Sequence, residues 1–195
     1  MPTLISGSTG VNKIQDGTIV NADINASAAI AGTKLANPGK VLQVVQAVKS
    51  SQSSYSAGAW RDIDLSVSLT ATSGSSFRIN TIVHTCEAYV NMSHSLKLQR
   101  SVDGGSWVDV KNGDNTAIRE GTFSNLRTAA SSAYTDILPI GGTYVDTPTY
   151  TSTVAYKVQA WFYNQTGYVN RNYRNTHATY DHSPISTLIV DELGA

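Results

Sequence analysis

The feature that most constrains this chain is a two-residue alternation of apolar and polar side chains that recurs after Gly39. The clearest case is segment 60–70, WRDIDLSVSLT, where aspartate and serine alternate with large apolar residues. These apolar residues are Ile63, Leu65, Val67 and Leu69. Because successive side chains of a strand point to opposite faces, the segment is predicted to be a strand with one wet face.

Further strands are predicted along the same part of the chain. Segment 77–90 has apolar residues at both parities, which favours a strand between two layers. Segment 152–164 places a set of apolar side chains on one face: Val154, Tyr156, Val158, Ala160 and Phe162. The sequence VDGG at 102–105 predicts a hairpin turn, since glycine tolerates positive φ. Strands are also predicted within 39–48, 172–181 and 186–193, whereas 105–150 is predicted to form long loops with short strands embedded.

Many short strands separated by Gly, Asn, Asp and Ser turns favour an all-β fold. We predict an antiparallel jelly-roll sandwich over residues 40–195, preceded by an extended N-terminal arm, residues 1–39, with at most a short helix. Within residues 13–38 the main apolar residues fall at intervals of about five or six, and the arm has too little large apolar surface for a core. These anchors are Ile14, Ile19, Ile24, Ile30 and Leu35. A segment of this kind becomes ordered against another surface, so the arm is predicted to be an assembly element.

Composition limits the partners of the chain. Charged residues make up 14% of it and the formal net charge is +0, so neither a nucleic acid nor an anionic membrane is an expected partner. No stretch is long enough to span a bilayer, and the first ten residues do not have the pattern of a signal peptide. Cys86 is the single cysteine and is predicted to be a small buried side chain.

Segment 14–35, IQDGTIVNADINASAAIAGTKL, resembles the N-terminal motif of bacteriophage tail-fibre and related virion proteins, with its Asp-Gly-Thr-Ile, Ala-Ala-Ile and Lys-Leu elements. After it, GKVLQVVQ at 39–46, YVDTPTYTSTVAYKV at 144–158 and ISTLIVDEL at 185–193 resemble a small phage jelly-roll module. Proteins of this type are similar in topology to the trimeric heads of complement and tumour-necrosis-factor proteins.

The resemblance implies a virion structural or host-attachment role without catalysis. It implies a homotrimeric knob, assembled in the host cytoplasm and held on the particle by contacts between the arm and other virion proteins. The chain has no long shaft, which leaves room for a short head, neck or collar spike rather than a distal tail fibre.

The residue pattern offers little for catalysis or metal binding. His177 and His182 flank Asp181, but this spacing matches no standard ligand pattern. His84 and Cys86 share a strand face without a second cysteine, which favours packing over zinc. No Gly-x-Ser-x-Gly elbow is present. We therefore predict no catalytic residue, no metal, no cofactor and no enzymatic activity.

Tyrosine and arginine gather in segment 163–175, YNQTGYVNRNYRN. Both residue types are favoured at interfaces because they combine apolar contact area with polar groups. The alternative is that these are ordinary tyrosines on a strand face. The predicted recognition surface, for a host-surface glycan or another partner, consists of Tyr168, Arg171, Tyr173 and Arg174.

Three other functions stay open. A capsid or neck decoration protein would use the same arm and knob without binding a receptor. A carbohydrate-binding module would not need residues 1–39 for its activity. A hydrolase would require a cleft with converging titratable groups.

Overall fold

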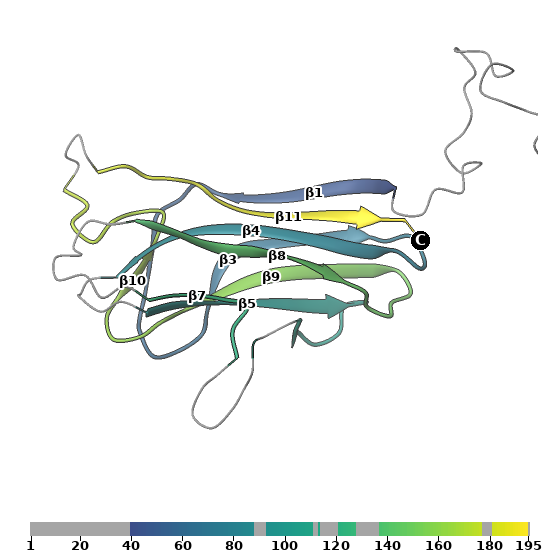
Figure 1. Cartoon of the computed structure of the whole chain (residues 1–195), viewed down its shortest axis with the longest axis horizontal. Coiled ribbons are helices and arrows are strands. Elements are labelled where there is room, and N and C mark those ends of the chain that lie inside the picture. Colours follow the sequence, from purple (N-terminus) through teal and green to yellow (C-terminus); the bar gives the residue numbers. More distant parts are fainter. Residues whose placement is uncertain are drawn as a thin grey trace, which may run out of the picture. The chain divides into compact units, whose positions relative to one another are not determined.

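The computed structural model describes residues 40–87, 93–110, 113, 121–127, 137–176 and 181–194. Within these ranges every regular element is a β-strand, and the strands form two antiparallel sheets (Figure 1). The arm and its anchors Ile14, Ile19, Ile24, Ile30 and Leu35 lie outside the described residues, so their assembly role and the domain boundary at residue 39 stay predictions.

The first sheet is built around β4, whose two edges take different neighbours. One edge pairs with β11 and, further along, with β10, while the other edge pairs with β8. Strand β1 lies outside β11, and β2 lies outside β10. The members are β1 (Val41–Lys49), β2 (Ser53–Tyr55), β4 (Ser76–Glu87), β8 (Leu138–Asp146), β10 (Gly167–Val169) and β11 (Ser186–Leu193).

The second sheet has the order β3-β9-β5, and the short strands β6 and β7 both pair with β5. Its members are β3 (Arg61–Thr70), β5 (Ser93–Val102), β6 (Val108–Asp109), β7 (Ser124–Arg127) and β9 (Thr153–Phe162). Without the short strands β2, β6 and β10, eight strands remain, and they pair first with last, second with seventh, third with sixth and fourth with fifth. An antiparallel ribbon rolled up in this way is a jelly roll, so the predicted fold is confirmed.

The core lies between the sheets and follows the alternation seen in the sequence. Every predicted inward residue of β3 and β9 is buried, including Ile63, Leu65, Tyr156 and Phe162. The expectation that 77–90 forms a strand between two layers is wrong for most of β4. Its residues from Phe77 to Val83 alternate between buried and exposed, because no second layer covers the outer face of this sheet in the described chain.

The hairpin turn predicted at 102–105 is present. Asp103 and Gly104 have φ values of 49° and 75°, and the N–H of Gly105 donates to the carbonyl of Val102 at 2.8 Å. Two successive positive φ angles define the type I′ turn that suits the twist of a β-hairpin. Hydrogen bonds from the backbone N–H groups of Thr153 and Thr151 lower the pKa of the Asp103 carboxyl to about 2, which ties this turn to the start of β9.

Two segments differ from the sequence-based prediction. Residues 138–146 form the nine-residue strand β8 where long loops with short strands were expected. The strand needs Gly141, because a Cβ there would lie 1.9 Å from the carbonyl oxygen of Thr81 on β4. Residues 172–176 belong to no strand. Instead, Asp181 accepts hydrogen bonds from the Asn172 amide at 2.6 Å and from the Thr176 N–H at 2.7 Å.

Candidate functional site

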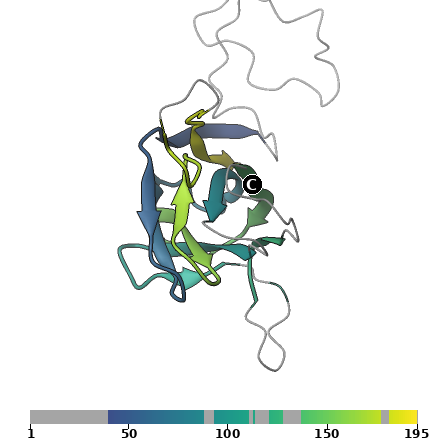
Figure 2. The same cartoon turned by 90° about the vertical axis from the view of Figure 1, so that its left-hand side faces the viewer.

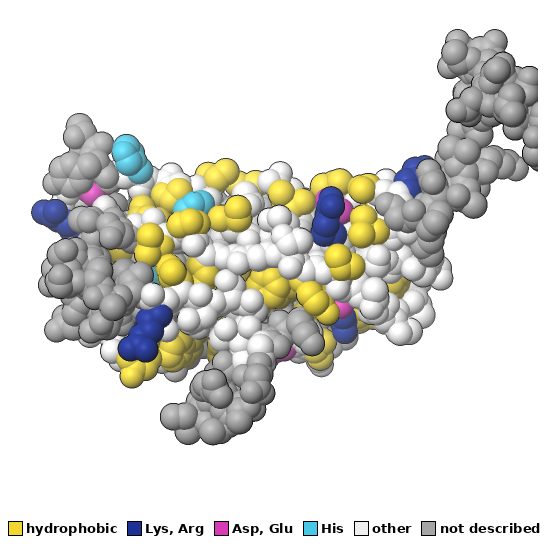
Figure 3. Space-filling model, in the orientation of Figure 1, with side chains coloured by type: hydrophobic (Ala, Val, Ile, Leu, Met, Phe, Trp, Pro, Cys, Tyr) yellow, Lys and Arg dark blue, Asp and Glu magenta, His cyan; other side chains and the backbone are white. Residues whose placement is uncertain are grey.

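The outer face of the first sheet exposes apolar side chains from several strands (Figure 3). Its most exposed members are Val44 at 59%, Val48 and Ile185 at 52%, Val145 at 47% and Ile82 at 45%. Strand pairing places these residues in rows across the sheet. Val44, Asp191, Arg78 and Val145 are successive partners in one such row.

Two charged side chains on this face, Arg78 and Asp191, form an ion pair. Arg78 donates from Nε to Asp191 Oδ2 at 2.7 Å, so the two opposite charges neutralise one another. Asn80 and Thr143 form a second polar cross-strand contact, with 3.1 Å between Nδ2 and Oγ1. Exposed apolar side chains that gather on one face and are flanked by polar groups are typical of protein interaction sites. This is the outer face of segment 77–90.

The predicted recognition residues lie around β10, at the end of the sandwich that faces the viewer in Figure 2. Tyr168 is 8% exposed and forms the base of the group. The Arg171 guanidinium lies 4.5 Å from the centre of its ring, and the Tyr173 ring centre lies 6.0 Å away. Tyr173 is 41% exposed and Arg174 is exposed. The structure thus brings Tyr168, Arg171 and Tyr173 together, with Tyr168 beneath the surface; their role in recognition stays a prediction.

Asn170 holds this loop end in place. It is fully buried and has a φ of 59°, a left-handed conformation that asparagine tolerates better than most residues. Its side-chain amide donates to the carbonyl of Lys49 at 2.7 Å, and its Oδ1 accepts from the Ser186 hydroxyl at 2.6 Å. Its backbone N–H donates to the carbonyl of His84 at 2.9 Å. The base of the loop is therefore fixed by three separate strands, β1, β4 and β11.

A buried Thr–His–Glu cluster lies at the same end and is not among the features predicted from the sequence. Thr85 Oγ1 lies 2.7 Å from His94 Nδ1, and His94 Nε2 lies 3.5 Å from Glu87 Oε2. Burial by itself raises the pKa of Glu87, but His94 and the N–H groups of Gln165 and Asn164 outweigh it and hold this pKa below its usual value. All three residues of the cluster are at most 1% exposed, so a substrate cannot reach the Thr85 hydroxyl.

Glu87 gives that cluster a structural role. Its Oε1 accepts hydrogen bonds from the N–H groups of Asn164 and Gln165, each at 2.8 Å, and so holds the turn between β9 and β10. Only the period-two parity of β4 and β5 could have suggested that Thr85 and His94 face the core. Their contact depends on the pairing of distant strands.

The described residues hold no group of three or more His, Cys, Asp or Glu side chains that could bind a metal ion. His177 lies outside the described residues, so its pairing with His182 stays untested. Cys86 is buried, as predicted. The described part of the chain also contains no helix that is long and apolar enough to cross a membrane.

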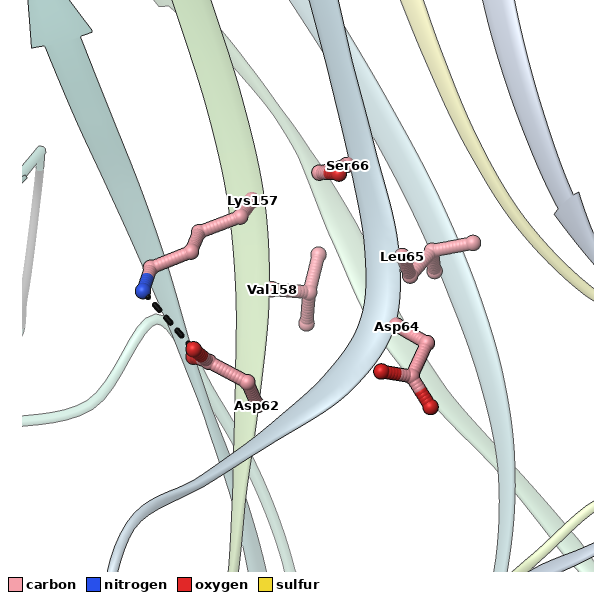
Figure 4. A pocket seen from close by; sticks show the side chains of 6 residues that line it. All are labelled: Asp62, Asp64, Leu65, Ser66, Lys157 and Val158. Atoms are coloured by element: carbon pink, nitrogen blue, oxygen red, sulfur yellow. Dashed lines mark hydrogen bonds and ion pairs between the residues drawn. The ribbon is translucent and has the colours of Figure 1, made fainter.

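A small hollow opens in the second sheet where β3 bulges away from β9 (Figure 4). Pairing is regular up to Asp62 and resumes at Ser66, so the residues between them have no regular partner on β9. The hollow has a volume of about 150 Å³. Lys157 and Asp62 meet at its edge with 3.0 Å between Nζ and Oδ2, and Asp64, with a φ of 55°, turns away from them.

Comparison with known proteins gives no family. No protein-family model and no curated protein matches the chain. The solved structures that are similar to it include two of low identity. A chain in the structure of the infectious bursal disease virus Gx strain is 8% identical, with a TM-score of 0.36 over 88% of this chain and 44% of that one. A chain from the Gt strain is 12% identical, with a TM-score of 0.28 over 89% of this chain and 43% of that one. The chain therefore spans less than half of either, and likeness at this level carries no argument about function.

Proposed function

We propose that this chain is a structural component of a virus particle, a β knob that assembles with copies of itself and is joined to the particle by residues 1–39. The sequence support is the resemblance of residues 14–35 to the arms of phage fibre proteins. The structural support is the nested strand pairing of a jelly roll. A homotrimer is the state that the resemblance implies.

The observation that carries the proposal is the exposed apolar face of the first sheet. Val44, Val48, Ile82 and Val145 keep about half of their surface in water, and burying such side chains is favourable by ~25 cal/mol per Å². Because Arg78 and Asp191 neutralise each other, a second copy approaching this face meets no net repulsion. In a cyclic trimer each copy would cover part of this face on the next.

The self-association test uses sedimentation of the full-length chain at micromolar concentration. The wild type is expected to sediment as a trimer, and the variant Val44→Asp/Ile82→Asp as a monomer, because it places charge on the contact face. Val108→Asp is the matched control, since Val108 is 47% exposed on β6 of the other sheet. A monomeric wild type, or dissociation caused equally by the control, would contradict the proposal.

The arm is tested in the particle. Ile19→Asp/Ile24→Asp should leave the knob folded and soluble but prevent its incorporation into virions, because it removes two apolar anchors. Incorporation at normal copy number would rule out the anchoring role of residues 1–39.

The host-attachment role rests on the loop end around β10. Virions that carry Arg171→Ala/Tyr173→Ala should contain the protein in normal amount but adsorb poorly to host cells. Unchanged adsorption would instead favour decoration of the capsid or neck without receptor binding. A non-enzymatic role is part of the same proposal, and the inaccessible Thr85 hydroxyl supports it.

A further inference from the structure

All three tryptophans of the chain lie on the outer face of the second sheet. Trp161 points outward from β9, opposite in parity to the buried Ala160 and Phe162. Trp107 lies over Lys157, and Trp60 lies over Lys97; both lysines also point outward. Three aromatic residues that are far apart in sequence therefore meet on a single face, which neither the loop-end prediction nor the proposed self-association uses.

The polar groups of this face form two copies of one arrangement. In the first copy, the Trp107 ring centre lies 4.7 Å from Lys157 Nζ, and Lys157 Nζ lies 3.0 Å from Asp62 Oδ2. The Gln159 side chain donates to the other oxygen of Asp62 at 2.7 Å. This set of four residues is called the β9 cluster below.

The second copy has the same members on the neighbouring strand. The Trp60 ring centre lies 4.5 Å from Lys97 Nζ, and Lys97 Nζ lies 3.4 Å from Asp109 Oδ2. The Gln99 side chain donates to the other oxygen of Asp109 at 2.9 Å. This set is called the β5 cluster below.

The two clusters interlock across antiparallel strands. Lys97 pairs with Gln159, and Gln99 pairs with Lys157, so the local two-fold relation between β5 and β9 relates one cluster to the other. The tryptophan of the β9 cluster precedes β6, whereas that of the β5 cluster precedes β3. The two indole rings thus lie on the same face but come from opposite edges of the sheet. Lys157 and Trp161 are four residues apart on β9, which corresponds to roughly 13 Å along the strand.

Two of the indole rings lie against lysine side chains of the sheet. The Lys157 and Lys97 side chains, whose ammonium groups lie close to the Trp107 and Trp60 rings, are only 15% and 12% exposed. Trp107 is itself 40% exposed, so part of its surface is open to a ligand. An aromatic ring that is already fixed loses little conformational freedom when a ligand stacks on it.

From these observations we propose that the outer face of the second sheet binds a neutral oligosaccharide of several sugar units. The flat faces of the tryptophan rings suit the apolar C–H faces of sugar rings, and the carboxylates and amides of the two clusters suit hydroxyl groups. Lys97 and Lys157 are each paired with an aspartate, so the two clusters favour a neutral ligand over an anionic one. Two copies of one arrangement suit a ligand built from repeating units.

The hollow beside the β9 cluster adds depth to this surface. It is lined by Asp62, Ser66 and Lys157 on the outer side and lies where β3 and β9 separate (Figure 4). Its polar rim offers a hydroxyl, a carboxylate and an ammonium group at the edge of the aromatic platform. A sugar that stacks on Trp107 could therefore direct a substituent into the hollow.

The test measures binding of the full-length chain to cello-, xylo-, malto-, manno- and chitohexaose by titration calorimetry, with heparin as the polyanionic comparison. We expect at least one neutral hexasaccharide to bind and heparin not to bind. Trp107→Ala should weaken the binding about tenfold or more, as loss of a stacking platform does. Gln99→Ala is a milder variant that should weaken binding without disturbing the core, which thermal melting checks.

Matched controls lie on the other two surfaces. Val44→Asp on the first sheet and Arg174→Ala at the loop end should bind the hexasaccharide as the wild type does. The inference is overturned if no neutral hexasaccharide binds at millimolar concentration, if heparin binds better, or if Arg174→Ala weakens binding as much as Trp107→Ala. This inference goes beyond the proposed function, and the two can fail separately. If the wild type is a monomer that binds the sugar, the proposed self-association is contradicted. If the wild type is a trimer that does not bind the sugar, the sugar-binding inference is contradicted.

Discussion

A charged network in the core joins the two sheets, and removing one member should have a large effect on stability. Arg100 of β5 donates from Nη1 to the two carboxylate oxygens of Asp146 on β8, at 2.8 and 2.7 Å. The hydroxyl of Tyr156 on β9 donates to Asp146 Oδ2 at 2.9 Å. Burial, and then the negative charge of Asp146, raise the pKa of Tyr156 far above its usual value, so the hydroxyl stays a donor.

The size of the effect follows from what each substitution leaves behind. Arg100→Met leaves the buried Asp146 carboxylate without its cation, and breaking a buried pair costs about 3–5 kcal/mol. Because the Arg100 side chain is 22% exposed, we expect the free energy of unfolding to fall by about 3 kcal/mol, at the lower end of this range. Tyr156→Phe removes one hydrogen bond to a charged acceptor and should cost about 2 kcal/mol. Arg100→Met/Asp146→Leu removes both charges and should be more stable than Arg100→Met alone.

Urea unfolding of the full-length chain at neutral pH, followed by tryptophan fluorescence, measures these differences. The protein concentration is held constant, because self-association adds to the apparent stability. The ranking expected is wild type, then Tyr156→Phe, then Arg100→Met, with the double variant above Arg100→Met. The reasoning is refuted if Arg100→Met costs no more than Tyr156→Phe, or if the double variant is less stable than Arg100→Met.

Two more predictions concern residues of β8 and β4. Gly141→Ala should destabilise the chain by about 3 kcal/mol, because its Cβ would lie 1.9 Å from the Thr81 carbonyl oxygen. Gly142→Ala is the control and should cost less, since its Cβ would meet only the Phe123 ring edge at 3.4 Å. Equal urea midpoints for the two variants would contradict this. Glu87 has a lowered pKa when folded, so the stability that it contributes is complete above its ordinary value of 4.5 and is lost as the pH falls below it. Glu87→Gln should therefore reduce the acid dependence of the melting temperature, and an unchanged dependence would exclude this role.

The inward faces of β3 and β9 could be predicted from the sequence, because strict alternation leaves a single way to bury Ile63 or Phe162. Strand β8 could not be, because Pro139, Gly141 and Gly142 are residues that usually mark loops. In the fold, Gly141 is present for a different reason, which is the close approach of β4. Local sequence cannot distinguish a glycine in a turn from a glycine under a neighbouring strand.

The grouping of the three tryptophans on one face could not be predicted from the sequence, for a related reason. Parity alone places Trp161 on the side of β9 opposite Phe162, and that much could have been read from the sequence. The meeting of Trp60 and Trp107 with β9 and β5 depends on which strands are neighbours, and that is decided by pairing across long stretches of chain. By contrast, the group in segment 163–175 could be predicted from the sequence, because its tyrosines and arginines are close together in the chain.

The charged core network and the outer face of the second sheet depend on the same strand register. On β5 and β9, the pair Arg100–Tyr156 points inward, and the adjacent pair Gln99–Lys157 points outward. A slip of β9 by one residue would turn Lys157 toward the core and away from Asp62, and would turn the Tyr156 hydroxyl away from Asp146, at a cost of several kcal/mol. The network that ties the sheets together therefore also fixes which side chains form the tryptophan face. A variant that weakens it while keeping the register should lose stability but retain sugar binding.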